Sequence, residues 1–212
     1  MPKILKFSLA FLSVVLVAWA ALALFPSRKT AEIRTVVLDA GHGGDDPGAT
    51  VGGVYEKDIN LAITLRVREL LEADGELTVL LTRGEDVFIS LTDRAAYANE
   101  AGADLFVSIH ANALENNDSF SGIYTFYHPQ KRSDQALART IQSAAAEAAG
   151  GIDRGVRGED YAVLRETTMS AVLVETGFMT CPEELARLTD AAYQDRLAAG
   201  IAQGILSLAA DR

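Results

Sequence analysis

Three short, almost entirely apolar runs that lie far apart in the chain constrain its fold most strongly. They cover residues 33–38, 105–109 and 171–174, and they are rich in β-branched side chains. Between them lie longer stretches, such as 58–73 and 134–149, in which apolar residues recur at helical spacing. Strands that alternate with amphipathic helices predict an α/β domain with a largely parallel sheet. Because the strands are almost continuously apolar, we expect both faces of this sheet to be buried.

The rest of the chain gives weaker signals of the same kind. Ser90, with Asp93 three residues later, is typical of a capped helix start, and Gly150 with Gly151 is typical of a helix end. The stretch 113–121 is polar and is expected to form an exposed loop. Further strands are predicted for residues 77–81, 122–127 and 161–164, and further helices for residues 90–100, from Pro182, and for 191–209.

The chain of 212 residues is predicted to hold one domain behind a hydrophobic N-terminal helix. Lys3 and Lys6 precede an uncharged apolar stretch, so residues 1–25 are interpreted as a signal peptide or a membrane anchor. Both interpretations stay open, and both export the rest of the chain. Residues 26–33 would then be a linker, and 34–212 the catalytic domain.

The charge balance argues against a nucleic-acid-binding protein, and the cysteine content excludes a fold stabilised by disulfides within the chain. The formal net charge is −10, and an acidic domain lacks the clustered Lys and Arg that nucleic-acid phosphates require. Cys181 is the single cysteine, so no disulfide can form within the chain. The fold must therefore be stabilised by its core.

Four side chains able to bind a metal are predicted to meet at one edge of the sheet. His42, His110 and Glu175 each follow one of the three apolar strands, and Glu56 lies in a loop just before a helix. In open α/β sheets, ligands bind at the carboxyl ends of the strands. Two imidazoles with one carboxylate form a catalytic zinc set that leaves a position open for water, and a second carboxylate could serve as a base. The spacing does not decide which glutamate has which role.

Phosphate-binding loops and the common zinc peptidase helix fit these residues less well. The glycine-rich loop 41–53 lacks the third glycine of a dinucleotide-binding loop, and its carboxylates would repel phosphate. No His-Glu-x-x-His helix of the common zinc peptidases is present. A single histidine at a strand end is often only a polar cap, but two in this arrangement favour a site. His128, before Pro129, is expected at the surface.

The motifs around these residues resemble a known family. Their order and spelling are similar to those of the zinc-dependent N-acetylmuramoyl-L-alanine amidases, the group called amidase type 3. The resemblance extends over almost all of the chain after the apolar segment, from about Thr35 to Leu208. The matching stretches are 36–48, 54–57, 81–83, 91–94, 104–112 and 171–178.

The resemblance implies a fold, a metal and a reaction. The fold would be a twisted mixed sheet of about six strands flanked by helices. The reaction would be hydrolysis of the amide between the lactyl group of N-acetylmuramic acid and the L-alanine of the peptidoglycan stem, in cell-wall remodelling or degradation. His42, Glu56 and His110 would hold one Zn²⁺ per chain, and Glu175 would be the catalytic carboxylate. The protein would work in the periplasm or cell envelope.

Three more residues match family positions without a fixed role. Asn112 would contact substrate, orient His110, or be structural. Arg83 and Arg94 are interpreted as members of ion pairs, with recognition of a substrate carboxylate as the alternative. The interval between Asn112 and Glu175 is too short for the inhibitory helical insert that some relatives carry. We therefore expect the protein to lack this insert. We also expect a monomer, and the sequence does not identify a protein activator.

Two other functions remain as alternatives. One is a different zinc hydrolase, such as a carboxypeptidase that acts within the stem peptide. The other is a peptidoglycan-binding protein without activity. The products of digestion would distinguish them, because only an amidase separates the sugar from L-alanine.

Overall fold

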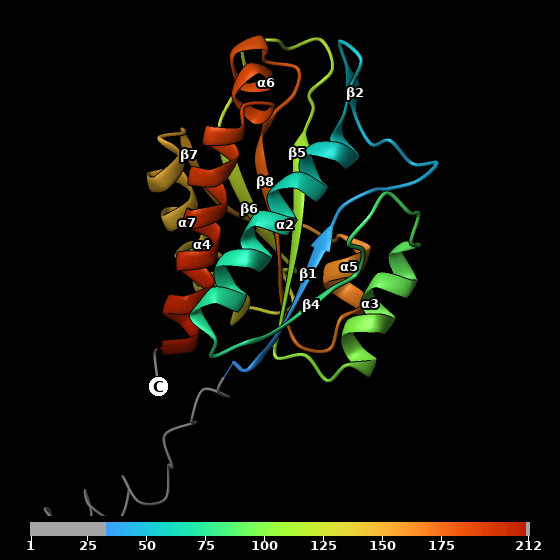
Figure 1. Cartoon of the computed structure of the whole chain (residues 1–212), viewed down its shortest axis with the longest axis vertical. Coiled ribbons are helices and arrows are strands. Elements are labelled where there is room, and N and C mark those ends of the chain that lie inside the picture. The colour runs from blue at the N-terminus through green and yellow to red at the C-terminus, as the bar shows by residue number, and fades with distance from the viewer. Residues whose placement is uncertain (1–32, 211–212) are drawn as a thin grey trace, which may run out of the picture. The chain divides into compact units, whose positions relative to one another are not determined.

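A six-stranded mixed sheet forms the centre of the protein (Figure 1). The computed structural model describes residues 33–210, so the expected signal peptide or anchor at 1–25 lies outside the described residues. The strands follow the order β4-β1-β5-β8-β6-β7 across the sheet. Their bounds are β1 Thr35–Ala40, β4 Thr78–Leu81, β5 Leu105–Asn112, β6 Ile123–Tyr127, β7 Asp153–Gly158 and β8 Ser170–Phe178. Two short strands, β2 Thr50–Val51 and β3 Val54–Tyr55, form a separate hairpin.

The direction of the strands divides the sheet into two parts. Strands β4, β1, β5 and β8 are parallel, whereas β6 is antiparallel to β8 and β7 is parallel to β6. The expected mixed sheet of six strands is therefore confirmed. The three apolar runs of the sequence are the neighbouring strands β1, β5 and β8, which explains why both of their faces are buried.

Helices cover both faces of the sheet (Figure 1). On one face, α2, α4 and α7 pack on the larger core, which includes Ile63, Ile141 and Leu197. On the other face, α3 and α5 pack on a smaller core around Phe106. The helix bounds are α2 Glu56–Asp74, α3 Leu91–Glu100, α4 Asp134–Ala149, α5 Ala162–Glu166, α6 Pro182–Leu188 and α7 Ala191–Ala210.

Helices α4 and α7 approach each other very closely. At Gly200 of α7, an added Cβ atom would lie 2.5 Å from the carbonyl oxygen of Ala144 and 2.7 Å from the Cα atom of Ala145. These distances are shorter than van der Waals contact, so the packing of the two helices depends on the missing side chain.

Two local predictions from the sequence were wrong, and one strand was not predicted. Residues 161–164 are not a strand: Tyr161 precedes the helix α5, which buries Val163 and Leu164 in the smaller core. A short apolar run fits a buried helix turn as well as a strand. His128 is only 6% exposed, and its Nε2 atom lies 3.1 Å from Asp160 Oδ1. Strand β7 was missed, because this edge strand is polar.

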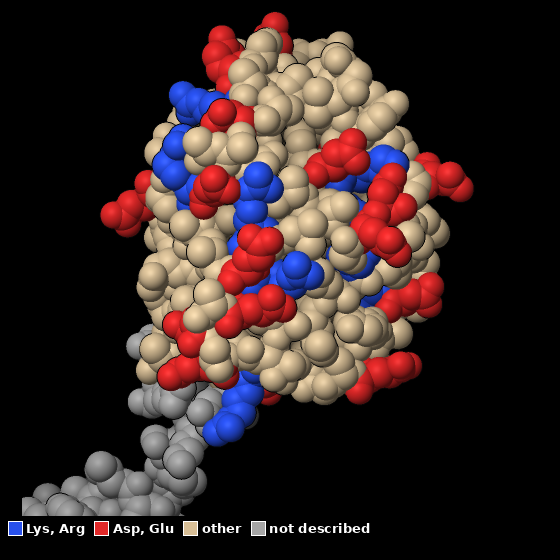
Figure 2. Space-filling view, in the orientation of Figure 1, with Lys and Arg blue, Asp and Glu red and all other residues tan. Residues whose placement is uncertain are grey.

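On the face drawn in Figure 2, Lys and Arg side chains are interspersed with Asp and Glu and form no continuous basic area. This face therefore carries no basic stripe of the kind that nucleic-acid binding uses.

Within residues 33–210, no helix is both long enough and apolar enough to cross a membrane.

Candidate metal centre

The topology brings the four predicted residues to one edge of the sheet. His42 lies in the loop after β1, and His110 and Glu175 lie on the neighbouring strands β5 and β8, where they are paired in register. Glu56 is the first residue of the helix α2, whereas the sequence placed it in the loop just before this helix. The crossover connections therefore align residues that are up to 133 positions apart in the sequence.

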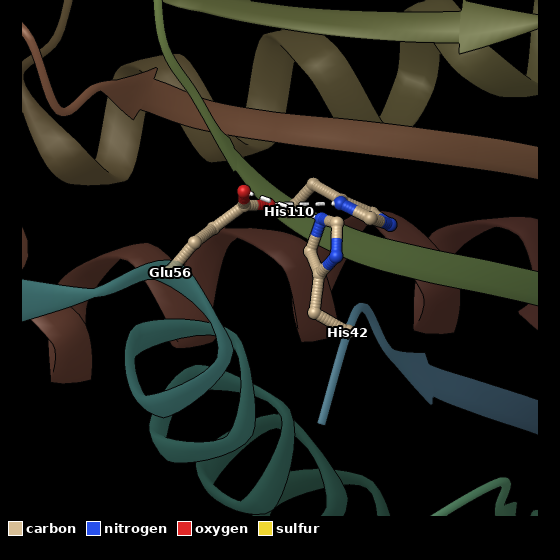
Figure 3. Close-up of side chains that lie close together, drawn as sticks. All are labelled: His42, Glu56 and His110. Carbon is tan, nitrogen blue, oxygen red and sulfur yellow. Dashed lines mark hydrogen bonds and ion pairs between the residues drawn. The ribbon is translucent and has the colours of Figure 1, made fainter. Parts of the chain in front are cut away.

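Three of these side chains point toward one another (Figure 3). Glu56 lies between the imidazoles: its Oε2 atom is 3.2 Å from His42 Nε2, and its Oε1 atom is 2.9 Å from His110 Nδ1. The two rings meet edge to face, with centroids 5.0 Å apart. One ligand atom from each residue lies within 4.8 Å of the other two. Two nitrogens and one carboxylate oxygen are a donor set that zinc accepts.

In this group, the carboxylate of Glu56 and the imidazole of His42 shift each other's pKa toward the charged form. Burial alone would raise the pKa of Glu56, but hydrogen bonds and attraction from His110 and His42 outweigh it and hold the pKa well below its usual range. Burial likewise opposes the charged form of His42, yet Glu56 and Asp46 raise its pKa to about 9. The carboxylate of Glu56 is therefore ionised throughout the physiological range and available to a cation.

Polar partners that the sequence did not reveal fix the orientation of this group. Asp46 Oδ2 lies 2.8 Å from His42 Nδ1, on the ring nitrogen opposite to the one that faces Glu56. Asn60, one helical turn after Glu56, donates to Glu56 Oε1 at 3.1 Å and to the Gly41 carbonyl at 3.2 Å. Such partners set the tautomer and the direction of ligand side chains. In the sequence, the only indication of these partners is their spacing. Asp46 lies four residues after His42, and Asn60 lies four residues after Glu56.

The His110 ring packs directly against the backbone of Gly41. A Cβ atom added to Gly41 would lie 2.2 Å from Cε1 of that ring. Since no side chain fits there, the glycine allows the imidazole to lie against the loop that carries His42. The ring is thus held between this loop and Glu56.

Glu175 differs from the other three residues because it is not hydrogen-bonded to them. Its side chain is 8% exposed, and its buried Oε2 atom has no hydrogen-bond partner among the described residues. Burial, together with repulsion from Glu56, raises the pKa of Glu175 to about 7, although the two histidines oppose the shift. A carboxyl group with such a pKa can accept and donate a proton near neutral pH.

All four residues line one open pocket with a volume of about 370 Å³. Apolar side chains, among them Leu91, Val163 and Leu173, form much of its wall, and Tyr161, just before α5, contributes an aromatic ring. An apolar wall with a few convergent polar groups is typical of a ligand-binding or active site.

The three residues without a fixed role lie in different surroundings. Asn112 lines the pocket, and its Oδ1 atom accepts a hydrogen bond from the Ala113 backbone. Arg94 forms the expected ion pair, at 2.7 Å with Asp39, and is 2% exposed. Arg83 is 3% exposed but forms no such pair among the described residues; its hydrogen bonds are to backbone carbonyls.

Comparison with known proteins finds a matching family model and solved structures of similar fold. A family model described as N-acetylmuramoyl-L-alanine amidase matches residues 36–207. The N-acetylmuramoyl-L-alanine amidase LytC of Bacillus subtilis (strain 168) is 42% identical over 178 residues, which are 82% of this chain and 35% of LytC. The chain therefore spans about a third of the length of that curated relative.

Two solved structures are similar over nearly their whole length. The N-acetylmuramoyl-L-alanine amidase from Clostridium difficile 630 has a TM-score of 0.80 and 40% identity, over 84% of this chain and 97% of that chain. The CwlD amidase from Clostridioides difficile, solved in complex with the GerS lipoprotein, has a TM-score of 0.78 and 36% identity, over 82% of this chain and 98% of that chain.

Proposed function

The chain belongs to the N-acetylmuramoyl-L-alanine amidase family, and we propose that it hydrolyses the amide bond between the lactyl group of N-acetylmuramic acid and the L-alanine of a peptidoglycan stem peptide. One observation carries the proposal. His42, Glu56 and His110 converge in the same pocket as a buried carboxyl group, Glu175, whose Oε2 atom has no partner among the described residues. A metal site beside a carboxyl group that has a free oxygen atom suits amide hydrolysis.

The residues present fit one zinc ion. His42 and His110 would supply imidazole nitrogens and Glu56 a carboxylate oxygen, and their ligand atoms lie close enough together for a single ion. When bound, zinc would polarise the substrate carbonyl and make water a better nucleophile. Asp46 would hold the His42 ring through Nδ1, and Asn60 would hold the carboxylate of Glu56.

Glu175 would handle the protons of the reaction. With a pKa near 7, its carboxylate can take a proton from the attacking water and then give it to the nitrogen of the departing L-alanine. Because Oε2 has no internal partner to release first, the group is ready to accept that proton. The apolar wall formed by Val163 and Leu173 would limit the access of water to the carboxyl group.

The test is digestion of purified peptidoglycan followed by mass spectrometry of the soluble products. We expect stem peptides with a free L-alanine amino terminus, and no release in the presence of a chelator. Glu175→Gln should lower kcat by about 10²- to 10⁴-fold, whereas Glu69→Gln, at an exposed position of α2, should have no effect.

Other products would point to other functions. Release of a terminal amino acid of the stem, with the sugar still attached to L-alanine, would indicate a carboxypeptidase. Bound zinc and bound peptidoglycan without any product would indicate a binding protein. Full activity of Glu175→Gln, or activity that survives removal of zinc, would contradict the mechanism.

We further propose that the protein is exported to the periplasm or cell envelope and acts as a monomer. Export is supported by the lysines and the uncharged apolar stretch of residues 1–25, as signal peptide or as membrane anchor. The monomer is supported by the composition of the site: one chain supplies His42, Glu56, His110 and Glu175, so the site needs no residue from a second copy. Amino-terminal sequencing of the exported protein and light scattering of the purified protein would test the two statements.

A further inference from the structure

Arg83 lies in the loop after β4 and is almost completely buried. All of its hydrogen bonds given by the structure are to backbone carbonyl oxygens. Nε donates to Ala40 at 2.8 Å, Nη2 donates to Gly41 and to Lys57 at 2.9 Å each, and Nη1 donates to Glu85 at 3.1 Å. One planar guanidinium thus contacts three separate segments of the chain.

Two of these segments carry candidate metal ligands. Gly41 is the residue before His42, and Lys57 is the residue after Glu56. Along the chain, the long loop after β1 separates the two segments, and Asn60 links them by hydrogen bonds to the Gly41 carbonyl and to Glu56 Oε1. The guanidinium is a second and more rigid link, because its donors lie in a fixed fork and reach the Gly41 and Lys57 carbonyls at once.

The loop that carries His42 has an unfavourable backbone conformation, which hydrogen bonds to its carbonyls help to hold. His42 has a φ angle of +61°, in the left-handed region that residues other than glycine rarely adopt. Arg94 helps to hold this conformation: its Nη1 atom donates to the Ala40 carbonyl and its Nη2 atom to the His42 carbonyl, both at 2.7 Å. Three successive carbonyls are therefore held by two buried guanidinium groups.

The two arginines differ in one respect that separates their roles. Arg94 neutralises the buried carboxylate of Asp39, whereas Arg83 has no carboxylate partner among the residues described. Attraction to Asp39 and Asp86 offsets part of the cost of burying the Arg83 charge. The hydrogen bonds of Arg83 all go to backbone carbonyls, so this side chain acts on the position of the backbone and not on a counter-charge.

We propose that Arg83 is a positioning residue for the metal centre, which sets the separation between the His42 imidazole and the Glu56 carboxylate before zinc binds. The inference rests on the proposed zinc site. A lysine at this position would keep the charge, but a single ammonium group lacks the fork that serves the Gly41 and Lys57 carbonyls together.

The test measures the zinc affinity of Arg83→Met and Arg83→Lys against wild type, by competition with a chromophoric chelator at constant pH. We expect the Kd for zinc to rise by about 10- to 100-fold in Arg83→Met, as when a partner that orients a ligand is lost. Arg83→Lys should show a smaller rise. Urea unfolding in excess chelator gives the stability of each metal-free variant.

Two controls separate positioning from loss of stability. Arg66→Met removes the same kind of side chain from the part of α2 that faces α7, outside the pocket, where Arg66 contacts Asp195 and the Ala62 carbonyl. Leu197→Ala destabilises the larger core without lining the pocket. Both controls should bind zinc with the affinity of wild type, although Leu197→Ala unfolds at a lower urea concentration.

The outcomes distinguish this inference from the proposed function. If wild type binds zinc and the Arg83 variants bind it equally well, the inference is wrong and the proposed function stands. If Leu197→Ala weakens zinc binding as much as the Arg83 variants do, Arg83 is only structural. If wild type itself does not bind zinc, the proposed metal centre is wrong. Should Arg83→Met not fold, Arg83→Lys decides between the first two results.

Discussion

At the scale of single residues, Asp39 pairs with Arg94, the arginine that holds the backbone around His42. Asp39 is fully buried at the end of β1 and accepts hydrogen bonds from Arg94, Ser108 and Thr82. Burial would raise the pKa of Asp39, but attraction to Arg94 and the two hydroxyl donors outweigh it and lower the pKa below 3.8. The carboxylate is therefore charged at every pH at which the protein functions.

This shift predicts how stability depends on pH. A carboxyl group whose pKa is lowered by folding stabilises the protein above its unfolded pKa, near 3.8, and the contribution is lost as the pH falls through the folded pKa. We expect Asp39→Asn to lower the free energy of unfolding by about 3 kcal/mol at pH 7, because Arg94 then lacks its counter-charge. Below pH 3.8 the difference from wild type should shrink.

Urea unfolding between about pH 3 and pH 7 measures this difference directly. Asp74→Asn, at an exposed position near the end of α2, is the control and should follow wild type at every pH. A difference that stays constant over the whole range would contradict the role given to the Asp39 carboxylate.

A second residue-scale prediction concerns Asp46. Its carboxylate lies 2.8 Å from His42 Nδ1, so it holds the ring and favours the tautomer whose Nε2 atom is free for a metal. Asp46→Ala should therefore raise the Kd for zinc by about 10- to 100-fold. Asp45→Ala, the neighbouring residue in the same loop, provides the matched control in a chelator competition assay. Equal affinity of both variants would show that Asp46 does not orient His42.

The site residues were partly predictable from the sequence, for a physical reason. Parallel strands end at the same edge of a sheet, so His42, His110 and Glu175 could be placed together from their positions after apolar runs. The role of Arg83 could not be predicted in this way. Its partners are backbone carbonyls, which every residue has, and their direction depends on the folded loop.

At the scale of elements, the contact between α4 and α7 depends on Gly200. Alanine has the higher helix propensity, by about 1 kcal/mol, but its Cβ atom would lie 2.5 Å from the Ala144 carbonyl oxygen. We expect Gly200→Ala to lower the free energy of unfolding by about 1–3 kcal/mol, because the helices must move apart. Urea unfolding would measure this change. Gln203→Ala, on the exposed side of α7, should stay within about 0.5 kcal/mol of wild type.

Elements could be predicted where one face of the chain packs on the core. Helices α2, α4 and α7 carry regular apolar stripes, and the strands β1, β5 and β8 each contain a buried apolar run, so sequence and structure agree there. Strand β7 lies at the edge of the sheet beside only β6, so its residues need not be apolar. The run 161–164 forms the start of α5, because the smaller core receives Val163 and Leu164 from a single helical turn.

At the scale of the whole molecule, the metal centre joins elements that the chain connects only through long crossovers. His42 follows β1, Glu56 begins α2, and His110 lies on β5. Unfolding separates these residues, so a zinc ion that binds all three binds only the folded state. Ligand binding of this kind stabilises a protein by mass action.

The last prediction follows because zinc would bind only the folded state. At free zinc about 100-fold above its Kd, the folded state should gain about 2.7 kcal/mol, and excess chelator should lower the Tm to that of the metal-free protein. In His110→Ala the Tm should no longer respond to zinc, since one of the three candidate ligands is gone. Differential scanning calorimetry with and without chelator makes the measurement. A Tm of wild type that does not change with zinc would mean that these three side chains hold no zinc, whatever reaction the pocket performs.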